Sequence, residues 1–384
     1  MKRYIVPDYN KSIVNIINSV LNYYSVENKY TTVNILDDKL GKNYKNILFM
    51  IFDGLGTDII QKNLSAGSFL NSNNYGSYTS VFPSTTTAAM TSYYTGLSPN
   101  EHGWIGWSLF FKEYSRIVDI YLNQDSFTGQ PIDDISVAYN IMPYRTIFEK
   151  IRNKNSDLGI FTLQPAHISF PSNGNINCKI NSLDNLFSKA SEICNYPGKN
   201  FIFSYWDNPD SVMHETGCNS KETVEYLQKI DNELSRLTTQ LDDTLVIISA
   251  DHGQTSITHD FYINDYQDLF DCMIMPPSVE SRAVSFFIKA NKKRQFERLF
   301  NTYFHDEFML FSRNEIFDKK ILGFGKTHSK TLDFIGDFVA IGIGSSLLRF
   351  KSMNSNQKRI KKFIGHHAGL TPEEMLVPLI IKEI

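Results

Sequence analysis

Four short apolar runs, each ended by Asp, Gly or Pro, constrain the fold of this chain more than any other feature. They are rich in β-branched and aromatic residues, as is typical of strands covered on both faces. The runs are Asn46–Phe52, Asp157–Leu163, Asn200–Tyr205 and Thr244–Ser249. Between them, Tyr144–Arg152 and Thr223–Leu241 have apolar residues at helical spacing. This alternation predicts an α/β fold with a mostly parallel central sheet and helices on both sides.

The character of the chain changes after residue 258. Ala283–Ile288 and Phe308–Phe311 are typical of strands, and Lys293–Phe304 is typical of a helix. We therefore expect a small α+β insertion in this part of the chain, and we expect a loop at residues 65–80. The predicted division is a first part of the core at residues 1–258, an inserted α+β subdomain at 259–345, and a C-terminal part of the core at 346–384.

Composition excludes several classes of protein. The 38 Lys and Arg residues oppose 41 Asp and Glu residues, and the net charge of −3 offers no basic surface for duplex nucleic acid or an anionic membrane. No stretch approaches the roughly 18 uninterrupted apolar residues of a membrane span. The four scattered cysteines are typical of reduced thiols, and the N-terminal segment lacks the apolar region of a signal peptide. We expect a cytoplasmic protein, and the sequence leaves its oligomeric state open.

Acidic residues and histidines follow the ends of three predicted strands. They are Asp53 after the first run, Asp210 and His214 after the third, and Asp251 and His252 after the fourth. Because ligands gather at the carboxyl ends of strands in open α/β sheets, we expect these side chains to converge. A single Asp in such a place is better explained as a turn residue or helix cap. The combination, with the pair His366–His367 near the C-terminus, favours a site for zinc or a similar divalent cation.

The segment Val81–Gly96, VFPSTTTAAMTSYYTG, supplies a candidate nucleophile. Pro83 ends an extended run, and Thr85–Thr87 stand where an Ala-containing helix begins. Free backbone N–H groups and the helix dipole make such a position favourable for a phosphate. Coordination to a cation is one way to activate a Thr hydroxyl. Taken alone, a hydroxyl here would be interpreted as a helix cap.

Five sequence blocks, in order, resemble the type I phosphodiesterase/nucleotide pyrophosphatase family of the alkaline phosphatase superfamily. They extend from residue 50 to 378 and read MIFDGLG, FPSTTTAAMTSYYTGLSPNEHG, PDSVMHETG, ADHGQ and HHAGLTPEEMLVPL. The resemblance implies an alkaline-phosphatase-like fold and two divalent metal ions, zinc in the first place and manganese as the alternative. Carried over by position, one ion would be held by Asp53, Thr86, Asp251 and His252, and the other by Asp210, His214 and His367.

The resemblance also implies an activity. We expect a metal-dependent phosphoester hydrolase, in the first place a phosphodiesterase/nucleotide pyrophosphatase that acts on a small nucleotide or similar diester. Thr86 takes the family's nucleophile position, which implies a phosphothreonine intermediate. A phosphonate hydrolase or phosphomonoesterase using the same site is the alternative. A binding protein that kept the fold without catalysis is a more distant one.

One departure from the family concerns substrate contacts. Nucleotide-cleaving members usually have an Asn a few residues after the H-G of the P-x-x-H-G block, and this chain has Trp107 there. We expect Trp104, Trp107 and Tyr205 to form part of an aromatic wall for the substrate, although packing against the core is the alternative. His328, in the inserted region, is expected to reach the entrance of the site.

Overall fold

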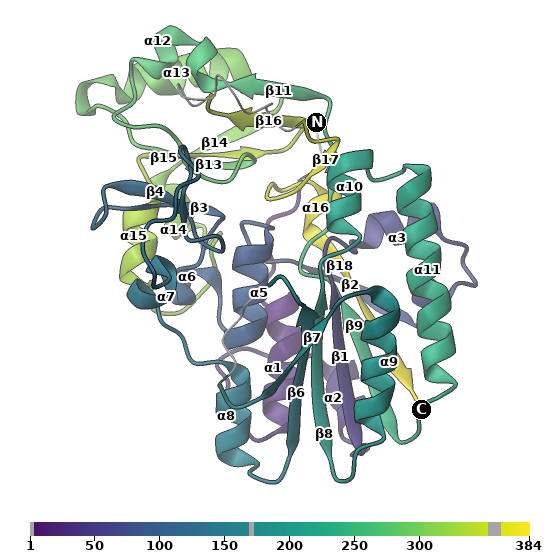
Figure 1. Cartoon of the computed structure of the whole chain (residues 1–384). Coiled ribbons are helices and arrows are strands. Elements are labelled where there is room, and N and C mark those ends of the chain that lie inside the picture. The colour runs from purple at the N-terminus through teal and green to yellow at the C-terminus, as the bar shows by residue number, and fades with distance from the viewer. Residues whose placement is uncertain (1–3, 169–172, 352–361) are drawn as a thin grey trace.

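The computed structural model describes residues 4–168, 173–351 and 362–384. One of its two main sheets has seven strands, of which five neighbours run parallel and β18 is antiparallel to both β9 and β2 (Figure 1). Its order is β2 (Asn74–Thr79), β18 (Leu376–Glu383), β9 (Thr244–Ser249), β1 (Asn46–Phe52), β8 (Asn200–Trp206), β6 (Gly159–Pro165) and β7 (Ile176–Ile180). The predicted α/β fold with a mostly parallel sheet is confirmed. The segment predicted as a loop at residues 65–80 instead contains α4 (Phe69–Ser72) and β2.

Helices cover both faces of this sheet. Figure 1 shows α1 (Ile13–Tyr23), α5 (Thr86–Thr95) and α8 (Ile147–Lys154) on one side, with α9 (Leu183–Cys194) and α11 (Lys221–Thr238) on the other. The central strands β1, β8 and β9 are buried along their whole length, which explains their uninterrupted apolar sequences. None of the helices in the described parts of the chain has the length and apolar character to cross a bilayer.

A second seven-stranded sheet is antiparallel throughout and lies above the carboxyl ends of the parallel strands (Figure 1). Its order is β14 (Phe308–Ser312), β15 (Phe338–Gly342), β13 (Ala283–Phe286), β12 (Ser278–Val279), β3 (Ser108–Phe111), β4 (Arg116–Asp119) and β5 (Gln124–Asp125). The strands predicted near residues 283 and 308 and the helix α13 (Lys293–Phe304) are present. The sequence did not indicate that residues 108–125 join this sheet. The division of the chain at residues 258 and 345 stays a prediction.

The C-terminal segment connects the two sheets. Gly365–His366 forms β17, which pairs with β10 (Thr255–Ser256), and the chain then continues through α16 (Pro372–Met375) into β18. Glu374 of α16 accepts two hydrogen bonds from the guanidinium of Arg282, at 2.7 and 2.8 Å, and both side chains are fully buried. Arg282 precedes β13 of the second sheet, so this ion pair fixes the segment that carries His367 against that sheet.

Candidate active site

The predicted ligand residues meet at the carboxyl ends of the three central strands. Strand β1 pairs in parallel with both β8 and β9, with Asn46 opposite Asn200 and opposite Thr244. The strands therefore end at the same level, and the residues that follow them lie together. Asp53 follows β1 directly, Asp210 opens α10 (Asp210–Thr216) after β8, and Asp251 and His252 follow β9.

One group of side chains surrounds the hydroxyl of Thr86. His252 Nε2 lies 3.4 Å from Asp53 Oδ1 and 3.4 Å from Asp251 Oδ2. Thr86 Oγ1 lies 3.3 Å from Asp53 Oδ2 and 3.2 Å from His252 Nε2. Asp53, Asp251 and His252 are buried, and each directs one atom into a set that could hold a metal ion. These are the four residues that the resemblance assigns to one ion.

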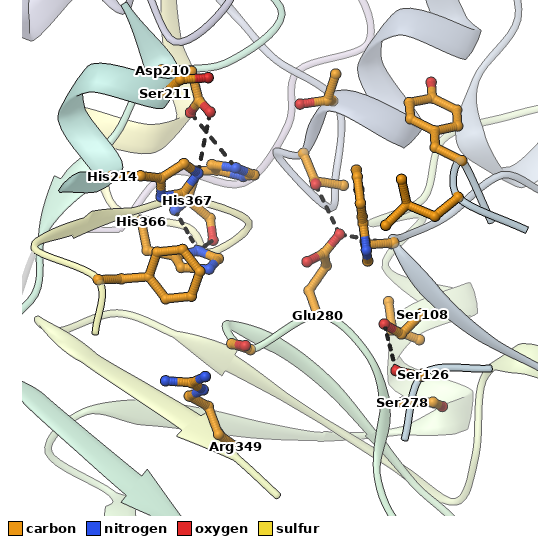
Figure 2. A pocket seen from close by; sticks show the side chains of 18 of the residues that line it. Ser108, Ser126, Asp210, Ser211, His214, Ser278, Glu280, Arg349, His366 and His367 are labelled. Atoms are coloured by element: carbon orange, nitrogen blue, oxygen red, sulfur yellow. Dashed lines mark hydrogen bonds and ion pairs between the residues drawn. The ribbon is translucent and has the colours of Figure 1, made fainter. Parts of the chain in front are cut away.

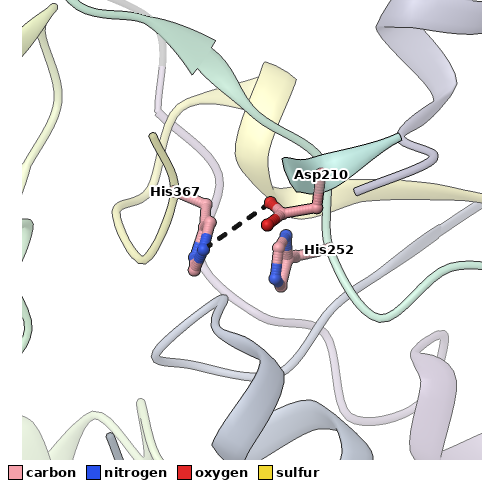
Figure 3. A group of neighbouring side chains, drawn as sticks. All are labelled: Asp210, His252 and His367. Carbon is pink, nitrogen blue, oxygen red and sulfur yellow. Dashed lines mark ion pairs between the residues drawn. The ribbon is translucent and has the colours of Figure 1, made fainter. Parts of the chain in front are cut away.

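A second group centres on Asp210 (Figure 3). Its Oδ2 lies 3.2 Å from His214 Nε2, and its Oδ1 lies 3.8 Å from His367 Nε2. The rings of His252 and His367 stack with their centroids 3.8 Å apart, so the two groups adjoin. Asp210, His252 and His367 also form a set of atoms that could hold a metal ion. The structure thus brings together all seven residues predicted from the resemblance.

The histidines of these groups have one ring nitrogen fixed by the backbone. The Nδ1 atoms of His214, His252 and His367 lie 2.8 to 3.1 Å from the carbonyl oxygens of Gly365, Gly253 and Ser84. Because a carbonyl can only accept, Nδ1 carries the proton and Nε2 presents a lone pair to the site, as in metal-bound histidines. His366 Nδ1 lies 2.9 Å from the backbone nitrogen of His367 and 3.0 Å from its carbonyl oxygen. His367, and not His366, belongs to the described set with Asp210 and His252 that could hold a metal ion, which favours His367 as the ligand.

The charges of the site fit divalent cations. Burial, together with the charges of Asp251 and Asp210, raises the pKa of Asp53 well above its usual range, and burial also raises the pKa of Asp251. Burial opposes ionisation of Asp210 as well, whereas protonation of the neighbouring His214, His367 and His252 would lower its pKa. Asp53 Oδ1 and Asp251 Oδ2 are buried without a hydrogen-bond donor among the described residues. Carboxylates in such an arrangement gain most from a cation.

The start of α5 places Thr86 without using its hydroxyl as a cap. Thr85 is the N-cap residue with extended backbone (φ −138°), but its side chain makes no capping hydrogen bond. Its hydroxyl instead donates to Glu280 Oε1 at 2.8 Å, while the Thr86 hydroxyl donates to Asp53. The interpretation of these hydroxyls as helix caps is therefore wrong. The first N–H groups of α5 stay available to a ligand beside Thr86.

A cavity of about 680 Å³ opens over Thr86 and is lined by residues from both sheets (Figure 2). The core contributes Asp53, Thr86, Asp210 and the histidines, and the second sheet contributes aromatic and hydroxyl side chains and Glu280. Trp107 lines this cavity, with its ring centroid 5.8 Å from that of Tyr121. Tyr205 also lines it, but its hydroxyl donates to Asp53 Oδ2 and so orients a candidate ligand.

Two of the four predicted substrate contacts lie elsewhere. Trp104 is fully buried, packs against Tyr139 and Tyr144, and donates its indole N–H to the carbonyl of Met142 at 3.0 Å. His328 caps α15 (Ser329–Phe334), where its Nδ1 accepts the backbone N–H of Lys330 at 3.2 Å. Neither residue lines the cavity, so the alternative interpretation of Trp104 as a packing residue is the one that fits.

Glu280 is a residue of the cavity that no sequence motif indicated. This residue follows β12, lines the cavity, and accepts hydrogen bonds from Thr85 and from the backbone N–H of Trp107. It lies 195 positions from Thr85 in a part of the chain without a recognisable motif. No local pattern indicated that it would lie beside the candidate nucleophile.

Comparison with known proteins assigns the family. The profile of the type I phosphodiesterase/nucleotide pyrophosphatase family matches residues 47–312, which is more than half of the chain. The chain belongs to this family. Membership indicates a phosphoester hydrolase, in agreement with the ligand groups and the hydroxyl that the structure brings together. No curated protein sequence matches the chain.

Solved structures share the fold at low sequence identity. Murine ectonucleotide pyrophosphatase/phosphodiesterase 5 is 18% identical, with a TM-score of 0.62 and coverage of 87% of each chain. The human protein of the same name is 17% identical, with a TM-score of 0.63 and the same coverage. Phosphonoacetate hydrolase from Sinorhizobium meliloti 1021, in complex with phosphonoacetate, is 15% identical, with a TM-score of 0.62 and coverage of 87% of this chain and 89% of that one. These likenesses agree with the predicted alkaline-phosphatase-like architecture.

Proposed function

We propose that this protein is a phosphodiesterase that cleaves a small phosphodiester or nucleotide through a covalent intermediate on Thr86, at a site for two divalent cations. The observation that carries the proposal is the position of Thr86 Oγ1. It lies at the first turn of a ten-residue helix, 3.3 Å from Asp53 Oδ2 and 3.2 Å from His252 Nε2. A hydroxyl among buried ligand-type atoms is placed to react and not to cap the helix.

Two groups of this chain would hold the cations. Asp53, Thr86, Asp251 and His252 would hold one, and Asp210, His214 and His367 the other, with zinc as the first choice and manganese as the alternative. When bound, such cations lower the pKa of a hydroxyl or water and offset the charge that develops on the phosphoryl oxygens. Tyr205 and Gln254 orient the ligands, because they donate to Asp53 Oδ2 and to Asp210 Oδ1.

Thr86 and the start of α5 would carry out the reaction in two steps. The Thr86 hydroxyl donates its hydrogen toward Asp53 Oδ2, which leaves lone pairs of Oγ1 directed at the cavity. Oγ1 loses its proton and attacks phosphorus in line, the bond to the leaving oxygen breaks, that oxygen takes up a proton and departs as an alcohol, and a phosphothreonine forms. The first N–H groups of α5 stabilise the phosphoryl oxygens. Water then cleaves the bond between phosphorus and Oγ1 and restores Thr86.

A solved structure of a similar protein supports the proposal of a phosphodiesterase with a Thr nucleophile. Murine ectonucleotide pyrophosphatase/phosphodiesterase 5 has also been solved as an inactive threonine-to-alanine variant in complex with AMP. By analogy, we propose a small phosphoester or nucleotide as the partner of this chain. A cytoplasmic location and the absence of nucleic-acid and membrane partners are further proposals, and they rest on composition alone.

A phosphonate hydrolase is the second candidate, and one observation favours it. The structure is as similar to phosphonoacetate hydrolase, at a TM-score of 0.62, as it is to the murine phosphodiesterase. The same two groups of ligands would serve either reaction, because both involve nucleophilic attack at phosphorus. The two functions differ in the bond that breaks, which is P–O in a diester and P–C in a phosphonate.

The test combines metal analysis with a substrate panel. The purified protein is loaded with zinc or manganese, its metal content is measured, and it is assayed with bis-p-nitrophenyl phosphate, p-nitrophenyl phosphate and phosphonoacetate. We expect about two ions per chain and the highest kcat/KM with the diester. Release of phosphate from phosphonoacetate at a higher kcat/KM would favour the second candidate. Bound metal without turnover of any phosphorus ester or phosphonate would contradict both.

A further inference from the structure

Glu280 presents one free carboxyl oxygen to the cavity beside the nucleophile. Its Oε1 accepts two hydrogen bonds at 2.8 Å, from Thr85 Oγ1 and from the backbone N–H of Trp107. Its Oε2 accepts no hydrogen bond from any of the described residues. Figure 2 shows the carboxyl group between the start of α5 and the cluster of His214, His366 and His367. The remaining oxygen therefore faces the space that a substrate would fill.

The other carboxylates that line this cavity are engaged. Asp53 and Asp210 belong to the candidate metal groups described above. Asp207 has His167 Nε2 at 3.1 Å from Oδ2 and accepts a hydrogen bond from Asn208 at Oδ1. Arg349 is the one Lys or Arg among the described lining residues, and it pairs with Asp260 at 3.3 Å. Glu280 thus adds negative charge close to the nucleophile, within the part of the chain that the structure describes.

We infer that Glu280 is a specificity-determining residue that makes the site select monoanionic phosphodiesters over dianionic phosphomonoesters. This inference rests on the proposed function. Thr86, which attacks the phosphoryl group, directly follows Thr85 in the chain. The hydroxyl of Thr85 holds the Glu280 carboxylate. Thr86 and Glu280 also line the same cavity. A second negative charge on the phosphoryl group is therefore repelled, whereas an ester oxygen in its place is not.

The Glu280 carboxylate and the second negative charge of a phosphomonoester are both present under mildly alkaline conditions. Burial raises the pKa of Glu280 to about 7, and cations in the neighbouring ligand groups would lower it. The second pKa of a phosphomonoester is about 6. An assay at about pH 8.5 therefore compares an ionised Glu280 with a fully ionised monoester.

The experiment uses two probes that differ in one charge and one methyl group, methyl p-nitrophenyl phosphate and p-nitrophenyl phosphate. Both release the same leaving group, so the ratio of their kcat/KM values reports the selection. Glu280→Gln removes the charge and keeps an oxygen that accepts from Thr85 and Trp107. We expect it to raise the monoester-to-diester ratio by about tenfold. Glu280→Asp keeps the charge and is the matched control, with a ratio within about twofold of wild type.

Several outcomes decide the inference. Glu280→Ala removes both the charge and the two hydrogen bonds, and it must raise the ratio even where its absolute rates fall. An unchanged ratio in Glu280→Gln and Glu280→Ala, with measurable turnover of the diester, would overturn the inference and leave the proposed function intact. An equal rise in Glu280→Asp would overturn it as well, because shape and not charge would then be responsible. A wild-type protein that hydrolyses neither probe would overturn the proposed function and this inference with it.

Discussion

The two seven-stranded sheets contribute different kinds of residues to one cavity. The parallel sheet supplies ligand-type side chains that follow directly after β1, β8 and β9, so their positions are set by buried strands. The antiparallel sheet supplies Trp107, which directly precedes β3, and Glu280, which directly follows the two-residue strand β12. This difference indicates that the residues proposed for catalysis and those proposed for substrate selection can be changed independently. Changes at the core should abolish turnover, and changes at the second sheet should alter substrate preference or stability.

The largest expected effect is that of Thr86→Ala. We expect kcat for bis-p-nitrophenyl phosphate to fall by at least about 10³-fold, because the nucleophile is removed. Thr87→Val is the matched control, since the Thr87 hydroxyl is buried without a hydrogen-bond partner among the described residues. Its replacement by a side chain of similar shape should leave kcat within about twofold. Equal losses in the two variants would indicate damage to α5 and not removal of a nucleophile.

Removal of the metal should affect both activity and stability. A chelator should abolish turnover and lower the Tm, because Asp53, Asp251 and Asp210 would then face one another without cations. Ion binding at about 1,000 times Kd stabilises the folded state by about 4 kcal/mol per site. Differential scanning calorimetry with and without zinc measures this effect. An identical Tm in both conditions would contradict the assignment of these residues to cations.

The ion pair between the sheets should matter for stability more than for chemistry. Arg282→Met leaves Glu374 buried without its cation, and we expect the free energy of unfolding to fall by about 3 to 5 kcal/mol. Arg116→Met breaks the partly exposed pair of Arg116 and Asp125 in the same sheet and should cost less than about 1 kcal/mol. Denaturant titrations compare the two variants. Equal losses would mean that the buried pair does not hold the C-terminal segment in place.

The smallest effects separate the two tryptophans. Trp104→Phe removes a buried hydrogen bond to Met142 and should lower the free energy of unfolding by about 1 to 3 kcal/mol without changing KM. Trp107→Phe should change KM for aryl phosphodiesters and cost less than about 1 kcal/mol in stability. Kinetics and denaturation of both variants test this contrast. The opposite pattern would place Trp104, and not Trp107, on the substrate wall.

The parallel sheet and its ligand residues could be predicted from the sequence because the information is local. Each buried strand is a continuous apolar run, and Asp53, Asp251 and His252 follow their strands at the first, second and third position after the strand end. Sheet geometry then brings the strand ends together. The free N–H groups at the start of α5 could be predicted in the same way, because a Thr-rich segment directly precedes an Ala-containing helix. The roles of these residues stay predictions until they are tested.

The second sheet could not be predicted because its contacts are distant in sequence. Residues 108–125 join it through a single backbone pairing between Ser108 and Val279. The same contact brings Glu280 to Trp107, across 173 positions. The burial of Trp104 could not be predicted either, because nothing near it in the sequence shows that the carbonyl of Met142 accepts its N–H.

The stereochemical course at phosphorus tests the central claim most directly. Each in-line displacement inverts the configuration of phosphorus, so attack by Thr86 followed by attack by water gives retention overall. The measurement is hydrolysis of one enantiomer of a chiral phosphorothioate diester in ¹⁸O-labelled water, with the product configuration determined by NMR. Retention is the result that a phosphothreonine intermediate predicts. Inversion would show a single attack by water and would contradict a covalent role for Thr86.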